Sequence, residues 1–282
     1  MINTVRIIVV LAIYAFFTSC TDVIDVEVSE AAPRLVIEAS LNWEKGTAGN
    51  TQSVKLSTST PYFNNTISNI VTGALVTVTD VTNGTDFIFT DQNNGVYTTS
   101  NFIPVVNHAY TLEVIYDGDT YIAEESLRSV VDIEDVYQTI EKGFDDEALE
   151  VNIDFNDPAD EENYYFIKIE AQDNLLPVLF SLSDEFTNGN LTSVYYERLK
   201  DTSIHREKFI AGDSVAIEFY GVSEQYYNYV GLLIDQYNSV GNPFSSTPVP
   251  LKGNCINITD PENYAFGYFR LTQVVKKSYT FE

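Results

Sequence analysis

Residues 109–127, "AYTLEVIYDGDTYIAEESL", decide the fold class of this chain. Two runs rich in Tyr, Thr, Val and Ile flank a short polar segment, and apolar and polar side chains alternate in the first run. Between the runs, Asp117 and Gly118 supply the positive backbone φ angles that a tight hairpin turn needs. The stretch therefore predicts two antiparallel β-strands joined by a short turn.

The same pattern of short β-rich runs and turn residues extends back to residue 33. Asn83-Gly84 and Asn94-Gly95 mark two of the turns. Short strands at this spacing predict an antiparallel β-sandwich of the Ig-like or fibronectin-like kind, which we place at residues 31–127. The predicted strands are "RLVIEASL", "QSVKLSTS", "ALVTVTDV", "DFIFTD", "GVYTTS", "AYTLEVIYD" and "TYIAEESL".

Longer β-rich elements follow residue 127. In "LEVNIDFND", residues 149–157, apolar and polar side chains alternate strictly, which is the pattern of a strand with one buried face. We therefore predict a second antiparallel Ig-like or fibronectin-like β-sandwich over residues 128–282. The apolar face of that strand carries Leu149, Val151, Ile153 and Phe155.

One helical pattern, at residues 223–239, interrupts the second β-rich region. Ser223 precedes it and is a favourable N-cap residue. Apolar side chains then recur at spacings of three and four, so that they form a stripe on one side of a helix. We expect this stripe to pack on the sheet of the second domain. Its members are Tyr226, Tyr227, Val230, Leu233, Ile234 and Tyr237.

The C-terminal region combines a strand pattern with a proline-rich segment. Residues 264–281 predict a closing strand or pair of strands. Residues 242–271 contain four of the nine prolines and predict an ordered loop, a kind of segment that is usually functional. Exposed aromatic side chains serve well in binding, although they equally serve to cover a core. The candidates for partner binding in this segment are Phe244, Tyr264, Phe266 and Tyr268.

The N-terminal segment carries a targeting signal. The apolar run from Ile7 to Phe17 is shorter than the roughly 20 residues of a membrane-spanning helix, and it has the length of a signal-peptide core. Two small residues and Cys20 follow, as in a lipoprotein signal. We predict a signal peptide at residues 1–19 and lipidation of Cys20.

The alternative is an ordinary signal peptide with a cysteine at this position by chance, and Phe17 in place of the more usual leucine leaves that alternative open. The residues that follow, 20–30, are acidic and suit a tether between a lipid anchor and a folded body. The membrane is therefore expected to hold this protein through its N-terminal lipid.

Composition excludes nucleic acid as a partner. The formal net charge is −26, with 15 Lys and Arg residues against 41 Asp and Glu residues. Binding to a phosphate backbone depends on basic side chains that displace counterions, and here these are greatly outnumbered.

The usual local signatures of catalysis are absent from the sequence. There is no Gly-x-Ser-x-Gly motif, P-loop or dinucleotide fingerprint, and His108 and His205 have no ligand-type residue at metal-binding spacing. Cys255 has only Lys252 as a basic neighbour, so we interpret it as a small buried apolar residue. We therefore expect a protein that is not an enzyme and that has no cofactor.

One acidic segment raises the alternative of a calcium site. Residues 154–163, "DFNDPADEEN", gather carboxylate and amide oxygens, the ligands that Ca²⁺ prefers. The segment lacks the glycine of an EF-hand loop and has the composition of a solvated hairpin loop, which is the interpretation we favour. The candidate ligands are Asp154, Asn156, Asp157 and Asp160.

The order of these features resembles a family of Bacteroidota outer-membrane lipoproteins known as domain of unknown function 4249. The likeness rests on Cys20 with its acidic tail, "PRLVIEASL", "TGALVTVTD", "GVYTTSNF", "YTLEVIYDGDTYIAEESL", "DFNDPADEENYYFIKI", "LSDEFTNGN", "AGDSVAIEFYGVSEQYYNYV" and "PVPLKGNCINITDPENYAFGYFRL". The resemblance implies an outer-membrane lipoprotein on the periplasmic or cell-surface face, often associated with a TonB-dependent receptor.

Three hypotheses for function follow. The first is a non-enzymatic binding or accessory protein, alongside a TonB-dependent outer-membrane receptor. The second is a carboxylate-based hydrolase or a glycan-binding protein. The third is a structural adhesin built of two Ig-like modules.

Overall fold

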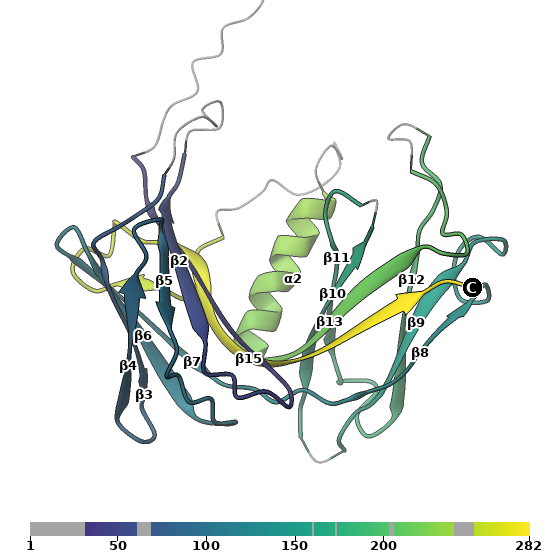
Figure 1. The fold of residues 1–282 in the computed structure, drawn as a ribbon, viewed down its shortest axis with the longest axis horizontal. Coiled ribbons are helices and arrows are strands. Elements are labelled where there is room, and N and C mark those ends of the chain that lie inside the picture. Colours follow the sequence, from purple (N-terminus) through teal and green to yellow (C-terminus); the bar gives the residue numbers. More distant parts are fainter. Residues whose placement is uncertain (1–31, 61–68, 160, 173, 203–205, 240–250) are drawn as a thin grey trace, which may run out of the picture. The chain divides into compact units, whose positions relative to one another are not determined.

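The computed structural model describes residues 32–60, 69–159, 161–172, 174–202, 206–239 and 251–282. Residues Pro33–Glu282 form one compact unit that consists mainly of β-strands, with one helix among its described residues (Figure 1). The predicted mainly-β class with one packed helix is confirmed. The predicted signal peptide and the lipidation site Cys20 lie outside the described residues.

The described strands form a twelve-stranded sheet and a three-stranded sheet. In spatial order, the larger sheet contains β11 (Val178–Ser183), β10 (Tyr164–Ala171), β13 (Ser214–Val222), β15 (Phe266–Thr280), β1 (Leu35–Glu44), β2 (Gln52–Thr58), β5 (Val96–Thr99), β4 (Thr85–Asp91), β3 (Leu75–Asp80), β6 (Ala109–Tyr116), β7 (Asp119–Ser126) and β14 (Ile256–Asn257). The smaller sheet contains β12 (Leu191–Glu197), β9 (Glu150–Asn156) and β8 (Ile133–Thr139).

The predicted hairpin at residues 109–127 is confirmed as β6 and β7. These strands pair antiparallel from Ala109–Ser126 to Tyr116–Asp119. Asp117 and Gly118 occupy the turn with φ angles of 51° and 87°. Glycine adopts such angles without strain and aspartate tolerates them, which explains why this dipeptide fixes the turn.

β15 connects strands from both halves of the sequence. Its first part pairs in parallel with β1, up to Glu44 and Val274, and its last part pairs antiparallel with β13. The predicted closing strand is therefore present, whereas the predicted loop over residues 242–271 is wrong for Ile256–Asn257, which form β14, and for residues 266–271, which begin β15. The prolines that suggested a loop all lie before residue 262, so they place no restriction on the later residues.

Three clusters of buried side chains form the core. The first fills the region enclosed by β1–β7 and takes in Phe269 and Leu271 from β15. The second lies between the three-stranded sheet and β10, β11 and β13. The apolar face predicted for β9 is confirmed, because Val151, Ile153 and Phe155 are buried in this second cluster, whereas the expected single buried face is wrong, because Glu150 and Asn152 on the opposite face are buried as well. The third lies between the opposite face of β10 and β13 and the helix.

Because both faces of β10 are covered, adjacent tyrosines can both be packed. Tyr165 points into the second cluster, whereas Tyr164 packs against Tyr227 of the helix with ring centroids 5.2 Å apart. Tyr165 is the buried member of this pair, whereas Tyr164 is only partly buried and lies nearer the surface.

Helix α2 spans Glu224–Asn238, as predicted, with Ser223 as its N-cap. The Ser223 hydroxyl accepts a hydrogen bond from the Tyr226 backbone N–H at 3.1 Å. Val230 is buried, and Tyr226, Tyr227 and Ile234 pack around it. Leu233 and Tyr237 are exposed, so the packed stripe is narrower and shorter than predicted.

The residues before β14 cross β15 at very close range. A Cβ atom on Gly253 would lie 1.4 Å from the carbonyl oxygen of Gly267, so only glycine fits here. The side-chain amide of the neighbouring Asn254 donates to the Phe269 carbonyl and accepts from the Phe269 N–H, both at 2.8 Å. It thereby forms the pair of hydrogen bonds that the backbone of a neighbouring strand would form. These contacts fix β14 beside β7.

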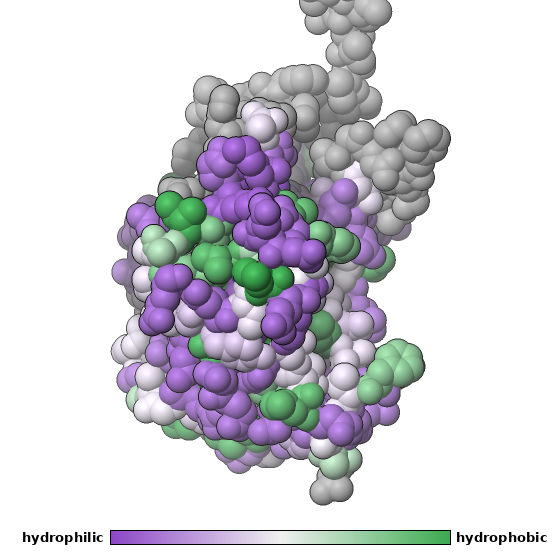
Figure 2. All heavy atoms as spheres, turned by 90° about the vertical axis from the view of Figure 1, so that its right-hand side faces the viewer, coloured by the Kyte–Doolittle hydropathy of each residue, from purple (hydrophilic) through white to green (hydrophobic). Residues whose placement is uncertain are grey.

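Hydrophilic side chains cover most of the side of the molecule that carries β8, β9 and β12, and hydrophobic side chains gather there in separate groups (Figure 2). Among the described residues, no helix has the length and apolar character needed to cross a membrane.

Candidate interaction surface

The outward face of the sheet β4-β3-β6-β7-β14 carries apolar side chains where polar ones are usual. In each strand the alternate side chains fill the first core cluster, so the remaining ones point away from it. The pairing register places Leu75 directly opposite Ile115, and Ile122 directly opposite Ile256. Cross-strand neighbours in such positions lie close enough for their side chains to touch.

Further aliphatic residues extend this group across five strands. Ile88 pairs with Thr77, which is two residues from Leu75, and Ile258 follows β14 beside Thr120. Leu75, Ile88 and Ile256 expose 67%, 69% and 65% of their surface. We define the aliphatic patch as Leu75, Ile88, Ile115, Ile122, Ile256 and Ile258.

Leu75 with Ile115 and Ile122 with Ile256 are direct cross-strand pairs, and Glu113 and Thr120 stand between the two pairs on the same face. Exposed aliphatic side chains that adjoin one another indicate a contact surface. This patch was not predicted from the sequence, because each strand was expected to carry one apolar face. The signal was nevertheless present in "DFIFTD", where Phe87, Ile88 and Phe89 are consecutive apolar residues. In a strand with one buried face, only Phe87 and Phe89 would need to be apolar.

Of the four aromatic residues predicted for partner binding, Phe244 lies outside the described residues. Tyr268 is buried, with its ring centroid 5.1 Å from that of Tyr226 and 4.7 Å from that of Tyr229. Its selection as an exposed contact residue is therefore corrected. It belongs to β15, and alternate residues of that strand point toward α2.

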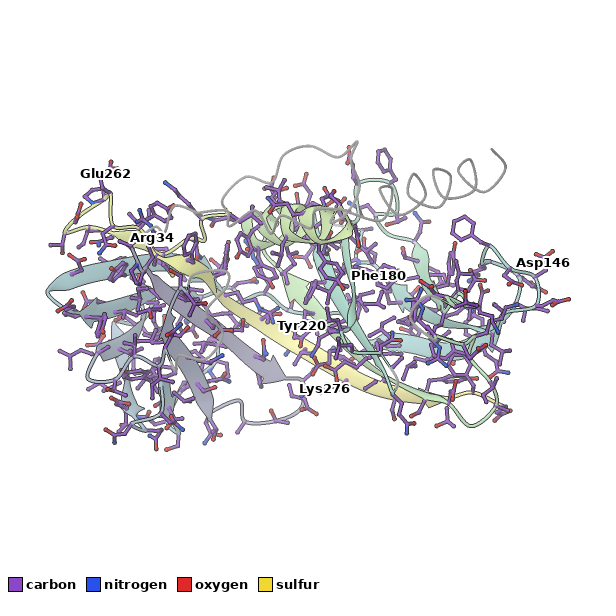
Figure 3. The ribbon with its side chains drawn as sticks, turned by 90° about the horizontal axis from the view of Figure 1, so that it is seen from above. Arg34, Asp146, Phe180, Tyr220, Glu262 and Lys276 are labelled. Atoms are coloured by element: carbon purple, nitrogen blue, oxygen red, sulfur yellow. The ribbon has the colours of Figure 1, made fainter. Side chains whose placement is uncertain are left out.

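Tyr264 and Phe266 are only partly buried. The Tyr264 ring lies between two cations, with the Arg34 guanidinium at 3.8 Å and the Lys252 amine at 3.9 Å from its centroid. Arg34 also donates to the carbonyl oxygen of Glu262 at 2.7 Å, and the two residues lie together at one end of the view in Figure 3. These contacts restrain Tyr264 and tie the C-terminal region to the start of β1.

A polar junction beneath α2 joins the helix to β7. The Ser223 hydroxyl donates to a Glu125 carboxylate oxygen at 2.7 Å, and the other oxygen accepts from the Ser126 N–H at 2.9 Å. Burial raises the pKa of Glu125, and these two hydrogen bonds act in the opposite direction. The junction holds the N-terminus of α2 in place.

An arginine adjoins this junction. Arg270 is buried, donates from Nε to the Ser40 hydroxyl at 3.0 Å, and lies over the rings of Tyr220 and Tyr226 at 4.6 and 4.8 Å. Such stacking stabilises a guanidinium away from water. The arrangement links β1, β13, β15 and α2.

Groups that could perform nucleophilic chemistry are placed in structural roles. Cys255 is buried, and burial raises the pKa of its thiol to about 12, so it is not a thiolate at neutral pH. His108 Nδ1 lies 2.9 Å from a carboxylate oxygen of Asp80, whose other oxygen accepts hydrogen bonds from the backbone of the turn after β3. His205 lies outside the described residues.

Three of the four candidate calcium ligands lie among the described residues. Asp157 is buried and accepts hydrogen bonds from the Tyr165 hydroxyl at 2.5 Å and the Gly189 N–H at 3.2 Å. Asp154 and Asn156 belong to β9, and Asp160 lies outside the described residues. In the part of the chain that the structure describes, no group of three His, Cys, Asp or Glu residues is placed to hold a metal ion.

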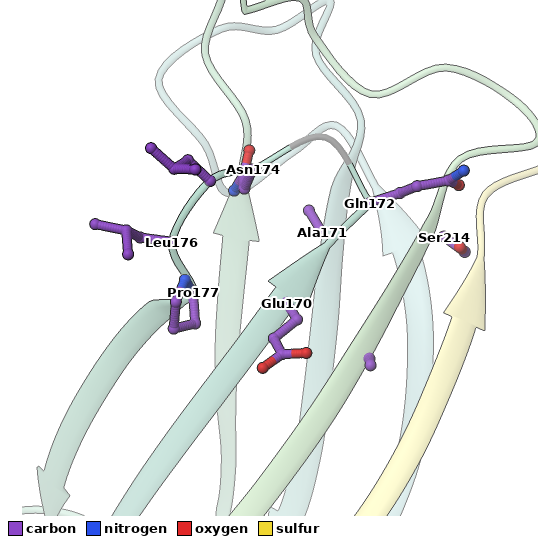
Figure 4. Close-up of a pocket in the computed structure, with 9 residues that line it drawn as sticks. Glu170, Ala171, Gln172, Asn174, Leu176, Pro177 and Ser214 are labelled. Carbon is purple, nitrogen blue, oxygen red and sulfur yellow. The ribbon is translucent and has the colours of Figure 1, made fainter. Parts of the chain in front are cut away.

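A depression of about 530 Å³ lies where β10, β11 and β13 end (Figure 4). Glu170, Gln172 and Asn174 line one part of it, and Leu176 and Pro177 line another. The Glu170 carboxylate forms an ion pair with Lys168. The polar groups of the lining are therefore the side-chain amides of Gln172 and Asn174 and the Glu170 carboxylate, whose charge is balanced by Lys168.

Comparison with protein families gives the context of these features. The family described as Domain of unknown function (DUF4249) matches residues 21–278. The chain belongs to the DUF4249 family. The resemblance inferred from the order of sequence features is thereby confirmed at the level of the family. No protein with a curated description matches this DUF4249 chain.

Three solved structures show a distant similarity to this DUF4249 chain. A segment of two fibronectin type-III domains from chicken tenascin is 9% identical, with a TM-score of 0.22, and covers 67% of this chain and 90% of its own. A DUF4785 family protein from Legionella pneumophila is 10% identical, with a TM-score of 0.27, over 66% and 52%. The chicken interferon gamma receptor alpha chain is 10% identical, with a TM-score of 0.20, over 68% and 90%. No functional conclusion follows from similarities this distant.

Proposed function

We propose that this DUF4249 protein is a lipid-anchored envelope protein with a non-enzymatic binding role, alongside a TonB-dependent outer-membrane receptor. The observation that carries the binding role is the aliphatic patch, which extends over five strands of one sheet. Fully burying one aliphatic side chain contributes about 1.5–3 kcal/mol, so covering this patch would stabilise a complex by several kcal/mol.

The anchor in this proposal is the lipidated Cys20. Fourteen residues lie between Cys20 and the first strand, which begins at Leu35. A chain of that length reaches at most ~50 Å when fully extended. The folded unit would therefore stay near the membrane that holds the lipid, within reach of a membrane-embedded receptor.

The test is to isolate the lipidated protein from its own membranes in mild detergent and to identify what co-purifies. A stoichiometric membrane partner is expected, and its absence counts against the binding role. Replacement of the acceptor cysteine (Cys20→Ser) should leave the protein soluble or unprocessed. Unchanged membrane attachment of that variant would refute the lipid anchor, whatever the outcome for the partner.

A further inference from the structure

We infer that the free edge of β12 is a docking site for an extended, apolar and basic peptide strand of a partner protein. A cleft of about 520 Å³ lies at this edge. It is separate from the aliphatic patch, which belongs to β3, β4, β6, β7 and β14. The inference is therefore independent of the proposed function and goes beyond it.

The lining of the cleft shows that it follows the strand edge. Five consecutive residues of β12, from Ser193 to Glu197, contribute to it. Successive side chains of a strand point to opposite faces, so a cleft lined by all of them must run along the strand. β12 is the last strand of its sheet and pairs only with β9 among the described strands.

The opposite wall of the cleft is apolar and belongs to the other sheet. Val178 and Phe180 come from β11, which is itself the last strand of the larger sheet. Val194 and Tyr196 of β12 face the same core cluster. An added strand could therefore hydrogen-bond to the β12 edge and insert alternate apolar side chains between the two sheets, which is the known mode of β-strand addition.

Phe144 is held over the cleft although it is exposed. It exposes 88% of its surface, yet its loop is fixed by Glu197, whose two carboxylate oxygens accept from the Phe144 and Asp145 N–H groups at 2.8 and 3.0 Å. Lys208 adds an ion pair to Asp145 at 2.6 Å. A rigid loop that presents an aromatic side chain to solvent is suited to recognition, because little entropy is lost when a partner covers the ring.

Gly143 makes this loop conformation possible. A Cβ atom at this position would lie 2.6 Å from the Glu197 carboxylate, so a larger residue here would displace that carboxylate from its hydrogen bonds to the loop. Hydrophobic side chains form separate groups on the mostly hydrophilic side of the molecule that carries β12 (Figure 2). Glu197 both anchors the loop and lines the cleft, so the loop and the cleft form one built surface.

The charge of the loop beside the cleft indicates which polar side chains the bound peptide strand should carry. The loop at residues 141–147 carries Glu141, Asp146 and Glu147 besides Asp145, which is paired with Lys208, and Glu197 lines the cleft itself. Lys142 supplies the one amine of the loop. That amine donates to the Ser193 hydroxyl at 2.7 Å, beside the cleft. Complementarity therefore favours a strand with Lys or Arg between its apolar residues.

The test measures binding of a labelled peptide, KVKVKFKVK, to the full chain by fluorescence anisotropy. The peptide KKKVVFVKK has the same composition and charge but no alternation. We expect the alternating peptide to bind about tenfold more tightly, and Phe144→Ala to weaken its binding about tenfold. Phe186→Ala is the matched control, since Phe186 is 90% exposed and lies outside the cleft lining.

Backbone pairing is tested with N-methylated peptides. In an added strand, the backbone N–H groups of alternate residues face the protein and the others face away. N-methylation of the peptide on all Lys residues, or on all Val and Phe residues, should therefore abolish binding in one of the two cases and leave it unchanged in the other. Equal binding of both parent peptides, no effect of Phe144→Ala, or tolerance of both methylated sets would each overturn the inference.

Discussion

The N-cap of α2 provides a stringent test of the packing described above. Ser223 accepts from the Tyr226 N–H and donates to Glu125, so Ser223→Ala removes both hydrogen bonds. Loss of an N-cap destabilises a protein by about 1 kcal/mol, and a buried acceptor left without its donor adds about 1–3 kcal/mol. We therefore expect the free energy of unfolding to fall by ~2–4 kcal/mol.

Urea unfolding followed by circular dichroism measures this loss. Ser53→Ala is a suitable control, because Ser53 is an exposed residue in the middle of a strand, and its change should stay within about 0.5 kcal/mol. A loss below about 0.5 kcal/mol for Ser223→Ala would show that the junction between α2 and β7 is not formed as described.

The pH dependence of the same junction has a definite sign. Burial raises the folded-state pKa of Glu125. A carboxyl group of this kind contributes stability below its unfolded pKa, and that contribution is lost as the pH rises through the folded value. Glu125→Gln should therefore gain stability relative to the unmodified protein as the pH rises. If the difference in the free energy of unfolding between Glu125→Gln and the unmodified protein stays constant as the pH rises, burial of this carboxylate is contradicted.

Three further results are expected. Gly253→Ala forces a Cβ atom against the Gly267 carbonyl, so thermal unfolding should show a loss of more than about 3 kcal/mol, and a normal midpoint would argue against the close crossing. Tyr165→Phe leaves a buried Asp157 oxygen without its donor, and urea unfolding should show a loss of ~1–3 kcal/mol. Cys255 should resist iodoacetamide at pH 8 until urea unfolds the chain; rapid alkylation of the folded protein would contradict its burial.

Local patterns in the sequence were sufficient to predict individual elements. The Asp117-Gly118 turn and the Ser223 N-cap each depend on chemistry within a few residues, and both are found where predicted. The mainly-β class follows from the same short-range signals. The local pattern of residues 264–281 predicted a strand, but it could not predict the partner of that strand, because the pairing of β15 with β1 joins residues more than 200 positions apart.

The candidate surface was harder to predict for a related reason. Tyr268 was selected as an exposed aromatic residue, but it is buried because α2 covers that face of β15. The patch residues Leu75 and Ile115 lie side by side only through the pairing of β3 with β6. Residue type indicated which side chains could bind a partner, whereas exposure depended on contacts between distant segments.

The most direct test of the proposed function compares two charge substitutions with equal exposure. Ile256 in the aliphatic patch and Ile210 outside it are both 65% exposed, so Ile256→Lys and Ile210→Lys change charge and solvation equally. The measurement is the amount of membrane partner that co-purifies with each lipidated variant in mild detergent. We predict a loss of about tenfold for Ile256→Lys and no loss for Ile210→Lys. Equal recovery of the partner with both variants would contradict the account.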